Sequence, residues 1–158
     1  MKSLRPIHAT LIVLLFAGTV LLADYASEGG FSHSGFERVS PDTQGLVVLD
    51  VSDLEPNGVR FFRFLNSGNQ EVKFFVGRDE NQTIQVAFDA NEICYKTKRG
   101  YTHQDDWLVC KKCEKAFRLS EVNAGGGGCK PVPVVHRVDG QKLILTESDI
   151  LAGWRYFR

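Results

Sequence analysis

The fold is decided by residues 59–76, which read VRFFRFLNSGNQEVKFFV. Two runs rich in phenylalanine and valine, 59–65 and 71–76, flank the turn-forming residues Asn66-Ser67-Gly68-Asn69. Aromatic and β-branched residues favour strands, whereas Asn, Ser and Gly favour tight turns. The stretch therefore predicts two strands that pair in an antiparallel manner across a short connection.

The neighbouring segments predict further strands. Residues 46–51 form a β-rich run, and in residues 83–88 apolar side chains alternate with polar ones. Such alternation places one face of a strand in the core and the other in solvent. The connections are too short for crossovers, so we expect an antiparallel meander of four or more strands.

The C-terminal end predicts a β-hairpin followed by a short helix. Residues 134–138 and 142–145 flank Asp139-Gly140, a dipeptide that suits a type I′ turn. The segment 146–149 resembles a capping box for a helix over 147–151. The predicted fold class is therefore mainly β, with the meander, a cysteine-rich loop region, this hairpin and this helix.

The first 23 residues have a different character. Lys2 and Arg5 precede an uncharged, apolar stretch from Ala9 to Ala23, a layout typical of a signal sequence. The stretch is shorter than the about 20 apolar residues of a membrane span. Cleavage after Ala23 would place Leu21 where a small residue is usual, so a retained N-terminal membrane anchor stays open.

This layout predicts the cellular location and the domain organisation. The positive residues are expected in the cytoplasm and the following chain outside it, either exported or anchored in the cytoplasmic membrane and facing the periplasm or cell exterior. Residues 24–44 are small and polar and predict a linker, which leaves 45–158 as the folded domain. The formal net charge is zero, so no excess of basic residues indicates binding to nucleic acid, and we expect no nucleic-acid partner.

The four cysteines follow the spacing C-x15-C-x2-C-x15-C. They are Cys94, Cys110, Cys113 and Cys129. A C-x-x-C pair lets two thiolates converge on one ion from a tight turn, and four thiolates complete a tetrahedral shell. The glycine run 125–128 before the last cysteine allows close approach of the backbone to such a centre. The sequence thus predicts a metal or cofactor site held by all four cysteines.

Disulfides are the main alternative, because an even number of cysteines in an exported chain is typical of a disulfide framework. A Cys110–Cys113 pair would be a redox dithiol, and a Cys94–Cys129 pair a structural staple. A c-type haem is excluded because Glu114, not histidine, follows the C-x-x-C pair.

Two histidines are candidate extra ligands. They are His103 and His136, although a lone histidine is more often a surface or packed residue.

Several motifs in the second half occur together in one known family. Residues 86–95 read VAFDANEICY and resemble the A-F-D-A-C-x-x-C-Y segment of the FtrD-like family of membrane iron–sulfur proteins. The resemblance covers roughly residues 58–158. It continues through KRGY at 98–101, LVCKKC at 108–113, Phe117 and GGCKP at 127–131.

The resemblance implies a membrane-linked protein with an iron–sulfur cluster, associated with bacterial iron transport and passing electrons there. The expected function is electron transfer or metal handling outside the cytoplasm, with the membrane and iron-transport or electron-transfer components as partners. The alternatives are a binding module stapled by structural zinc or disulfides, and a dithiol redox enzyme using Cys110 and Cys113. We expect an electron-transfer or metal-binding protein rather than an enzyme with its own substrate.

The chain departs from the family pattern at Asn91, where the family usually has a fifth cysteine. In one interpretation that position is not a ligand, and the four remaining cysteines form a complete shell. In the other, a three-cysteine centre needs histidine, water or the Asn91 oxygen as its fourth ligand.

Overall fold

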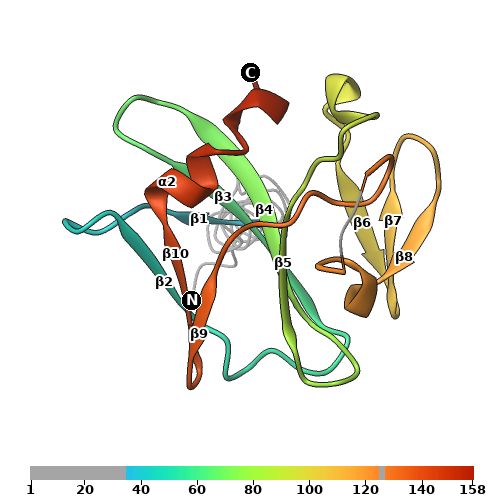
Figure 1. Cartoon of the computed structure of the whole chain (residues 1–158), viewed down its shortest axis with the longest axis horizontal. Helices are drawn as coiled ribbons and strands as arrows, with labels where there is room; N and C mark the ends of the chain where they lie inside the picture. The colour runs from blue at the N-terminus through green and yellow to red at the C-terminus, as the bar shows by residue number, and fades with distance from the viewer. Residues whose placement is uncertain (1–34, 125–126) are drawn as a thin grey trace, which may run out of the picture. The chain divides into compact units, whose positions relative to one another are not determined.

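A computed structural model describes residues 35–124 and 127–158 (Figure 1). The predicted signal sequence or anchor, residues 24–34 of the predicted linker and residues 125–126 of the glycine run lie outside the described residues. The part from Gly35 to Arg158 forms one compact unit. Within the described residues, we find no helix with the length and apolar character needed to cross a membrane.

The central sheet has the strand order β1-β3-β4-β5. The quoted stretch forms β3 (Val59–Leu65) and β4 (Glu71–Arg78), which pair in an antiparallel manner as predicted, and β5 (Ile84–Phe88) follows antiparallel to β4. The first strand, β1 (Phe36–Val39), pairs parallel with β3. Regular structure therefore begins earlier than expected, inside the segment 24–44.

The second sheet shows where the strand pairing differs from the expected four-stranded meander. Strand β2 (Leu46–Asp50) pairs with β10 (Lys142–Thr146) instead of with its sequence neighbour β3, and β9 (Arg137–Asp139) flanks β10. Val47 and Leu49 of β2 are buried and belong to the same core as the apolar side chains of β10. Hydrophobic alternation identifies a strand but does not identify its partner, which tertiary packing selects.

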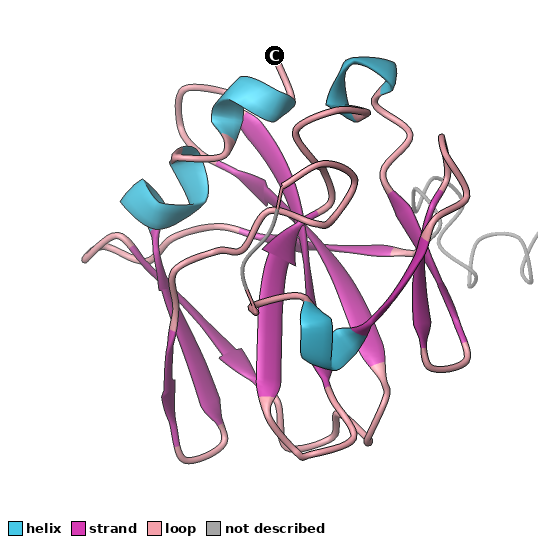
Figure 2. Ribbon diagram, turned by 45° about the vertical axis from the view of Figure 1, so that its right-hand side comes forward, coloured by secondary structure: helices cyan, strands magenta, loops and turns pink. Residues whose placement is uncertain are grey.

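The mainly β fold class, the C-terminal hairpin and the short helix are confirmed (Figure 2). Gly140 adopts a positive φ of 59° in the hairpin turn, as the Asp-Gly pair predicts. The backbone N–H of Asp149 donates to Thr146 Oγ1 at 3.1 Å, which caps helix α2 (Glu147–Leu151).

A third, smaller sheet is formed by the cysteine-rich half of the chain. It contains β6 (Tyr101–Gln104), β7 (Trp107–Cys110) and β8 (Ala116–Arg118), in that order. Its apolar side chains pack on the central sheet in a core that is separate from the one beneath β2 and β10.

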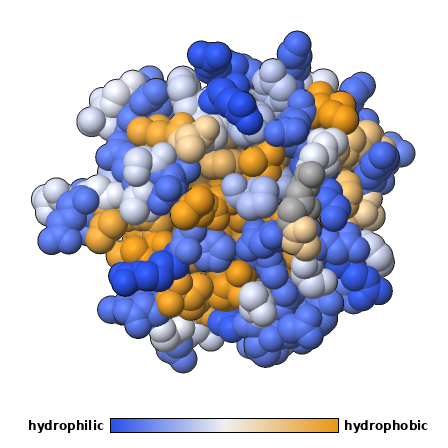
Figure 3. Space-filling view, in the orientation of Figure 1, coloured by the Kyte–Doolittle hydropathy of each residue, from blue (hydrophilic) through white to orange (hydrophobic). Residues whose placement is uncertain are grey.

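Strand β4 divides these two cores. The adjacent residues Phe74 and Phe75 are both fully buried, and they belong to different cores because successive side chains of a strand point to opposite faces. The central sheet is thus covered on both sides. On the face shown in Figure 3, apolar residues gather toward the middle and hydrophilic residues surround them.

The segment after the last cysteine runs back along β5. The backbone of Val132 accepts from the Phe88 N–H at 2.8 Å and donates to the Ala90 carbonyl at 3.1 Å, and Val134 donates to Val86 at 3.0 Å. This pairing explains why β9 begins later than the predicted strand over 134–138. It also holds the loop that carries Cys129 beside the end of β5.

Candidate metal centre

The four cysteines come from three segments around the small sheet. Cys94 precedes the short helix η1 (Tyr95–Thr97), which follows β5, and Cys110 is the last residue of β7. Cys113 lies in the turn between β7 and β8, and Cys129 lies beyond η2 (Leu119–Glu121). The fold therefore brings together residues as far apart in sequence as 94 and 129.

Three of the thiols form a tight group. The Sγ atoms of Cys94, Cys113 and Cys129 all lie within 4.8 Å of one another, and those of Cys94 and Cys129 are 3.8 Å apart. Cys110 is only 1% exposed, and its thiol is close enough to influence the ionisation of Cys94. All four cysteines are free thiols.

Crowding of the thiols opposes their ionisation when no cation is bound. Desolvation is the main cause, followed by the neighbouring thiols of Cys129, Cys110 and Cys113, and together they raise the pKa of Cys94 to about 12. A bound metal ion reverses this balance, because it coordinates thiolates and compensates their charge. The donor set therefore fits a soft, thiolate-binding metal such as iron or zinc.

The C-x-x-C pair is presented by a tight turn. The N–H of Glu114 donates to the Cys110 carbonyl at 2.9 Å, and the N–H of Cys110 donates to the Lys115 carbonyl at 2.9 Å. Glu114 has a φ of 60°, in the left-handed region, which lets the chain reverse directly after Cys113. The turn thus brings both cysteines of the pair near Cys94.

Asn91 reproduces the turn of a second C-x-x-C pair. Its Oδ1 accepts from the N–H groups of Ile93 at 3.1 Å and Cys94 at 2.6 Å, and its Nδ2 donates to the Tyr101 hydroxyl at 2.8 Å. The same Nδ2 lies 3.6 Å from Cys110 Sγ. Two backbone donors require the oxygen on their side, so the orientation of the amide is determined by its partners.

Tyr101 connects this turn to the last cysteine. Its buried hydroxyl donates to the Cys129 carbonyl at 2.6 Å while accepting from Asn91, and its own N–H donates to Asp89 Oδ1 at 2.6 Å. Burial raises the pKa of Tyr101 well above its ordinary value, which keeps the hydroxyl protonated as a donor. One side chain therefore links the positions of Asn91 and Cys129.

Asp89 is buried directly beneath this network. It is 7% exposed, and burial raises its pKa to about 7 despite the bond from Tyr101 and the nearby Lys111 and Lys73. Gly100 permits the contact, because a Cβ there would lie 2.1 Å from Asp89 Oδ2. Only glycine fits at that position, which also has a positive φ of 66°.

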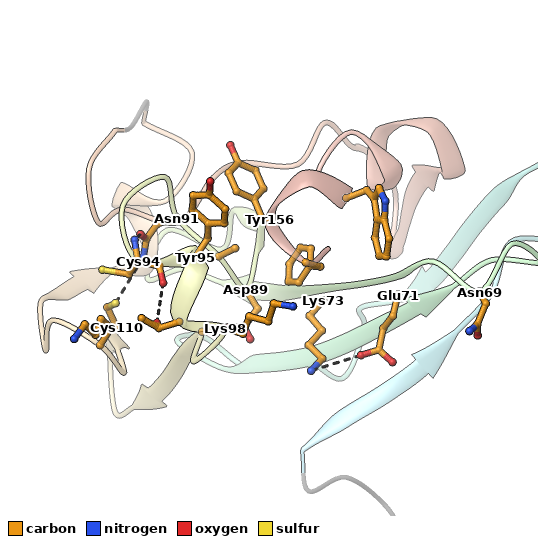
Figure 4. Close-up of a pocket in the computed structure, with 16 residues that line it drawn as sticks. Asn69, Glu71, Lys73, Asp89, Asn91, Cys94, Tyr95, Lys98, Cys110 and Tyr156 are labelled. Carbon is orange, nitrogen blue, oxygen red and sulfur yellow. Dashed lines mark hydrogen bonds and ion pairs between the residues drawn. The ribbon is translucent and has the colours of Figure 1, made fainter.

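A small cavity of about 160 Å³ opens beside the thiols of Cys94 and Cys110. Asp89 and Asn91 line it, with aromatic side chains from η1 and the C-terminus and lysines at its edge (Figure 4). The cavity does not border Cys113 or Cys129 among its lining residues.

The histidines proposed as extra ligands lie elsewhere. His103 is on β6, and its buried Nε2 has no hydrogen-bond partner in the described part of the chain. His136 Nδ1 lies 2.8 Å from the Val134 carbonyl. Within residues 35–124 and 127–158, neither joins a converging group of ligand atoms.

Sequence reasoning did not select Tyr101 or Asp89 as site residues. Both belong to motifs that carried the family resemblance, AFDA and KRGY, but nothing in their spacing indicated a role. A buried tyrosine hydroxyl or carboxyl can be recognised as important only once its partners are known.

The family comparison agrees with this geometry. The sequence matches the family described as "Membrane iron-sulfur containing protein FtrD-like" over residues 54–157. The chain belongs to this family.

Two curated proteins also show similarity. They are the acetoacetyl-CoA synthetases of Mus musculus and Rattus norvegicus, 27% and 28% identical over 143 residues, which cover 79% of this chain and 19% of theirs. The chain thus spans about a fifth of the length of the curated relatives it matches. No solved structure matches the chain.

Replacement of Tyr101 by phenylalanine tests the link between Asn91 and Cys129. The Tyr101→Phe variant keeps the buried ring but leaves the Cys129 carbonyl and one Asn91 N–H without their partner. We expect the free energy of unfolding of the reduced, metal-free protein to fall by about 1–3 kcal/mol. Urea denaturation measures it, with Tyr95→Phe as the control, and equal stabilities of both variants would contradict the proposed link.

Replacement of Asp89 by asparagine tests the buried carboxyl through pH. The pKa of Asp89 is raised in the folded state, so the native protein binds more protons than the unfolded chain between about pH 4 and 7. The contribution of Asp89 to stability is therefore greatest below pH 4 and is lost as the pH rises through 7.

We expect Asp89→Asn to remove this dependence. The variant should gain stability relative to the parent between pH 5 and pH 8, by up to a few kcal/mol. Denaturation of the reduced, metal-free protein across this range measures the difference, with exposed Asp106→Asn as the control. A difference that is constant with pH would show that Asp89 does not titrate in this way.

Proposed function

We propose that Cys94, Cys110, Cys113 and Cys129 hold a redox-active iron centre, and that the protein transfers electrons outside the cytoplasm in connection with iron transport. The observation that carries the proposal is the convergence of the Cys94, Cys113 and Cys129 thiols from three separate segments, with Cys110 in the same turn as Cys113. Soft thiolates select iron–sulfur chemistry, zinc and copper(I) over hard cations. The family description favours iron among these.

A closed shell favours electron transfer over catalysis. Four thiolates fill the tetrahedral positions of an ion, whereas catalytic metal sites keep one position open for substrate or water. When bound, iron in such a shell supplies a site that gains and loses one electron. The chain's own residues hold the ligands in place and shield the centre on its buried side.

The surrounding residues suit a redox role. The N–H of Asn91 directed at Cys110 Sγ stabilises negative charge on sulfur, and hydrogen bonds to ligand sulfurs are among the factors that set reduction potentials. Cys94, Cys113 and Cys129 remain partly exposed, so the centre lies near the surface. A partner can therefore approach it closely.

Structural zinc is the second candidate function. A closed shell of four thiolates is equally the arrangement of structural zinc sites, which stabilise small domains. Cys110 belongs to the core under the small sheet, and Cys94 and Cys113 pack against it, so a structural ion there would stabilise the fold.

The proposed location follows from the N-terminal sequence. Residues 1–23 act as a signal sequence or membrane anchor, and the domain lies on the outer side of the membrane, with membrane iron-transport or electron-transfer components as partners. The positive residues before the apolar stretch and the membrane association of the family support this proposal.

Serine substitutions test the ligands. We expect Cys113→Ser and Cys129→Ser to lower bound iron more than about tenfold, since even loss of an outer-shell partner costs 10- to 100-fold in metal affinity. Iron content and visible thiolate-to-iron absorption of the anaerobically purified full chain measure this, before and after chemical reduction. Lys112→Ser, within the same turn, is the control and should retain the iron. Full iron binding by both cysteine variants would contradict the proposed ligands.

Reporter fusions test the location. A phosphatase that is active only outside the cytoplasm, fused after Leu54, should be active, and deletion of residues 9–23 should abolish the activity because export requires the apolar stretch. A reporter that is active only in the cytoplasm should give the reverse pattern. Activity of the second reporter alone, with the apolar stretch intact, would disprove export.

A further inference from the structure

The spacing of the thiols fits one metal ion better than a cluster of several irons with inorganic sulfide. We propose that the centre is mononuclear: a single ion bound by Cys94, Cys110, Cys113 and Cys129, with Asn91 outside the coordination shell as a hydrogen-bond donor. The inference rests on the proposed function for its ligands. It differs from the cluster that the family description suggests.

The distances between the sulfur atoms carry the argument. A thiolate binds iron or zinc at about 2.3 Å, so two sulfurs on one tetrahedral ion lie about 3.8 Å apart and never more than about 4.6 Å. The Cys94 and Cys129 sulfurs are 3.8 Å apart, and the group formed with Cys113 lies within 4.8 Å. Three sulfurs thus already have nearly the separation that a shared ion requires.

A multi-iron cluster needs a different arrangement. Its cysteines bind different irons, so the iron and sulfide core lies between their sulfur atoms and separates them beyond the limit for one ion. At most two of any three cysteines can share an iron in a two-iron cluster with two thiolates on each iron. The compact group of three sulfurs would have to open to admit such a core.

The space around the thiols agrees with the distances. The neighbouring cavity of about 160 Å³ borders Cys94 and Cys110 but not Cys113 or Cys129, so a cluster placed there would not reach all four ligands. On the buried side, Tyr101 and Leu108 are fully packed around Cys110. The cavity therefore gives no support to a cluster shared by all four cysteines.

Asn91 is excluded as the fourth ligand by its own hydrogen bonds. Its oxygen accepts from the N–H groups of Ile93 and Cys94, so it faces the backbone of the turn. Its Nδ2, which carries no lone pair for a metal, faces Cys110 Sγ at 3.6 Å. Cys110 lies outside the group of three sulfurs but lines the same cavity as Cys94, and it is the proposed fourth ligand. Asn91 is then a positioning residue that donates to it.

The stoichiometry of iron and sulfide tests the inference. The full chain is purified in detergent without oxygen, incubated with excess ferrous iron and sulfide, and desalted. We expect one iron per chain, less than about one tenth of a sulfide per chain, and the electron paramagnetic resonance of a single high-spin ferric ion after oxidation. Two or more irons with an equal amount of sulfide would overturn the inference.

The metal and sulfide contents of the protein distinguish a failure of the inference from a failure of the proposed function. One zinc per chain that iron cannot replace would support a mononuclear centre and disprove the redox role. A sulfide-containing cluster that is reversibly reduced would support the redox role and disprove the mononuclear centre. A metal-free protein with two disulfides would disprove both.

The variant Asn91→Asp tests the positioning role. Aspartate keeps the oxygen that accepts from Ile93 and Cys94, but it replaces the N–H donor to Cys110 with negative charge. We expect unchanged iron stoichiometry and a lower midpoint potential in spectroelectrochemical titration. Exposed Asn81→Asp introduces the same charge far from the thiols and serves as the control. Equal potentials of the two variants, or a loss of the iron signal in Asn91→Asp alone, would overturn the positioning role of Asn91.

Discussion

The hydrogen bonds of the buried Asn91 amide are the interaction on which the arrangement of the cysteine loops depends. The side chain is 2% exposed, and a buried amide without partners would cost roughly 1–3 kcal/mol. It satisfies its oxygen with two backbone donors of the turn that carries Cys94, and its nitrogen with Tyr101 and Cys110. Three segments are thereby held in one position relative to one another.

The central sheet gives this network a rigid base. Strand β5 is buried along its whole length, and it ends shortly before Asn91. The Val132–Val134 segment pairs with β5 and brings Cys129 to the same place, where the Tyr101 hydroxyl binds its carbonyl. Cys129 therefore meets Cys94 because the segments that carry them are both attached to the end of β5.

Local sequence patterns predicted the strands but not all of their partners. The two runs within residues 59–76 have strong strand composition. The connection between them is too short for any arrangement other than an antiparallel pair, so their pairing could be predicted. The partner of β2 lies near the C-terminus, and no local signal distinguishes β10 from β3 as its neighbour. Strand β1 was not predicted, because four residues in a polar stretch are too few to show hydrophobic alternation. Its stability comes from tertiary contacts such as that between Phe36 and Phe61, whose ring centroids are 5.5 Å apart.

For the site, too, local sequence patterns predicted some features and not others, as Asn91 illustrates. Cysteine spacing predicted the convergence of thiols, because a metal shell and a disulfide framework, the two interpretations of that spacing, both bring sulfur atoms together. The family pattern presented Asn91 as a missing ligand, yet its oxygen accepts from the same two N–H groups that a thiolate at the start of a C-x-x-C turn would. The turn that carries Cys94 thus remains intact without a fifth sulfur. A neutral amide next to Cys110 also adds no negative charge beside the cysteines, so Asn91 forms the hydrogen bonds of the turn without adding to the repulsion that ionised thiols would experience.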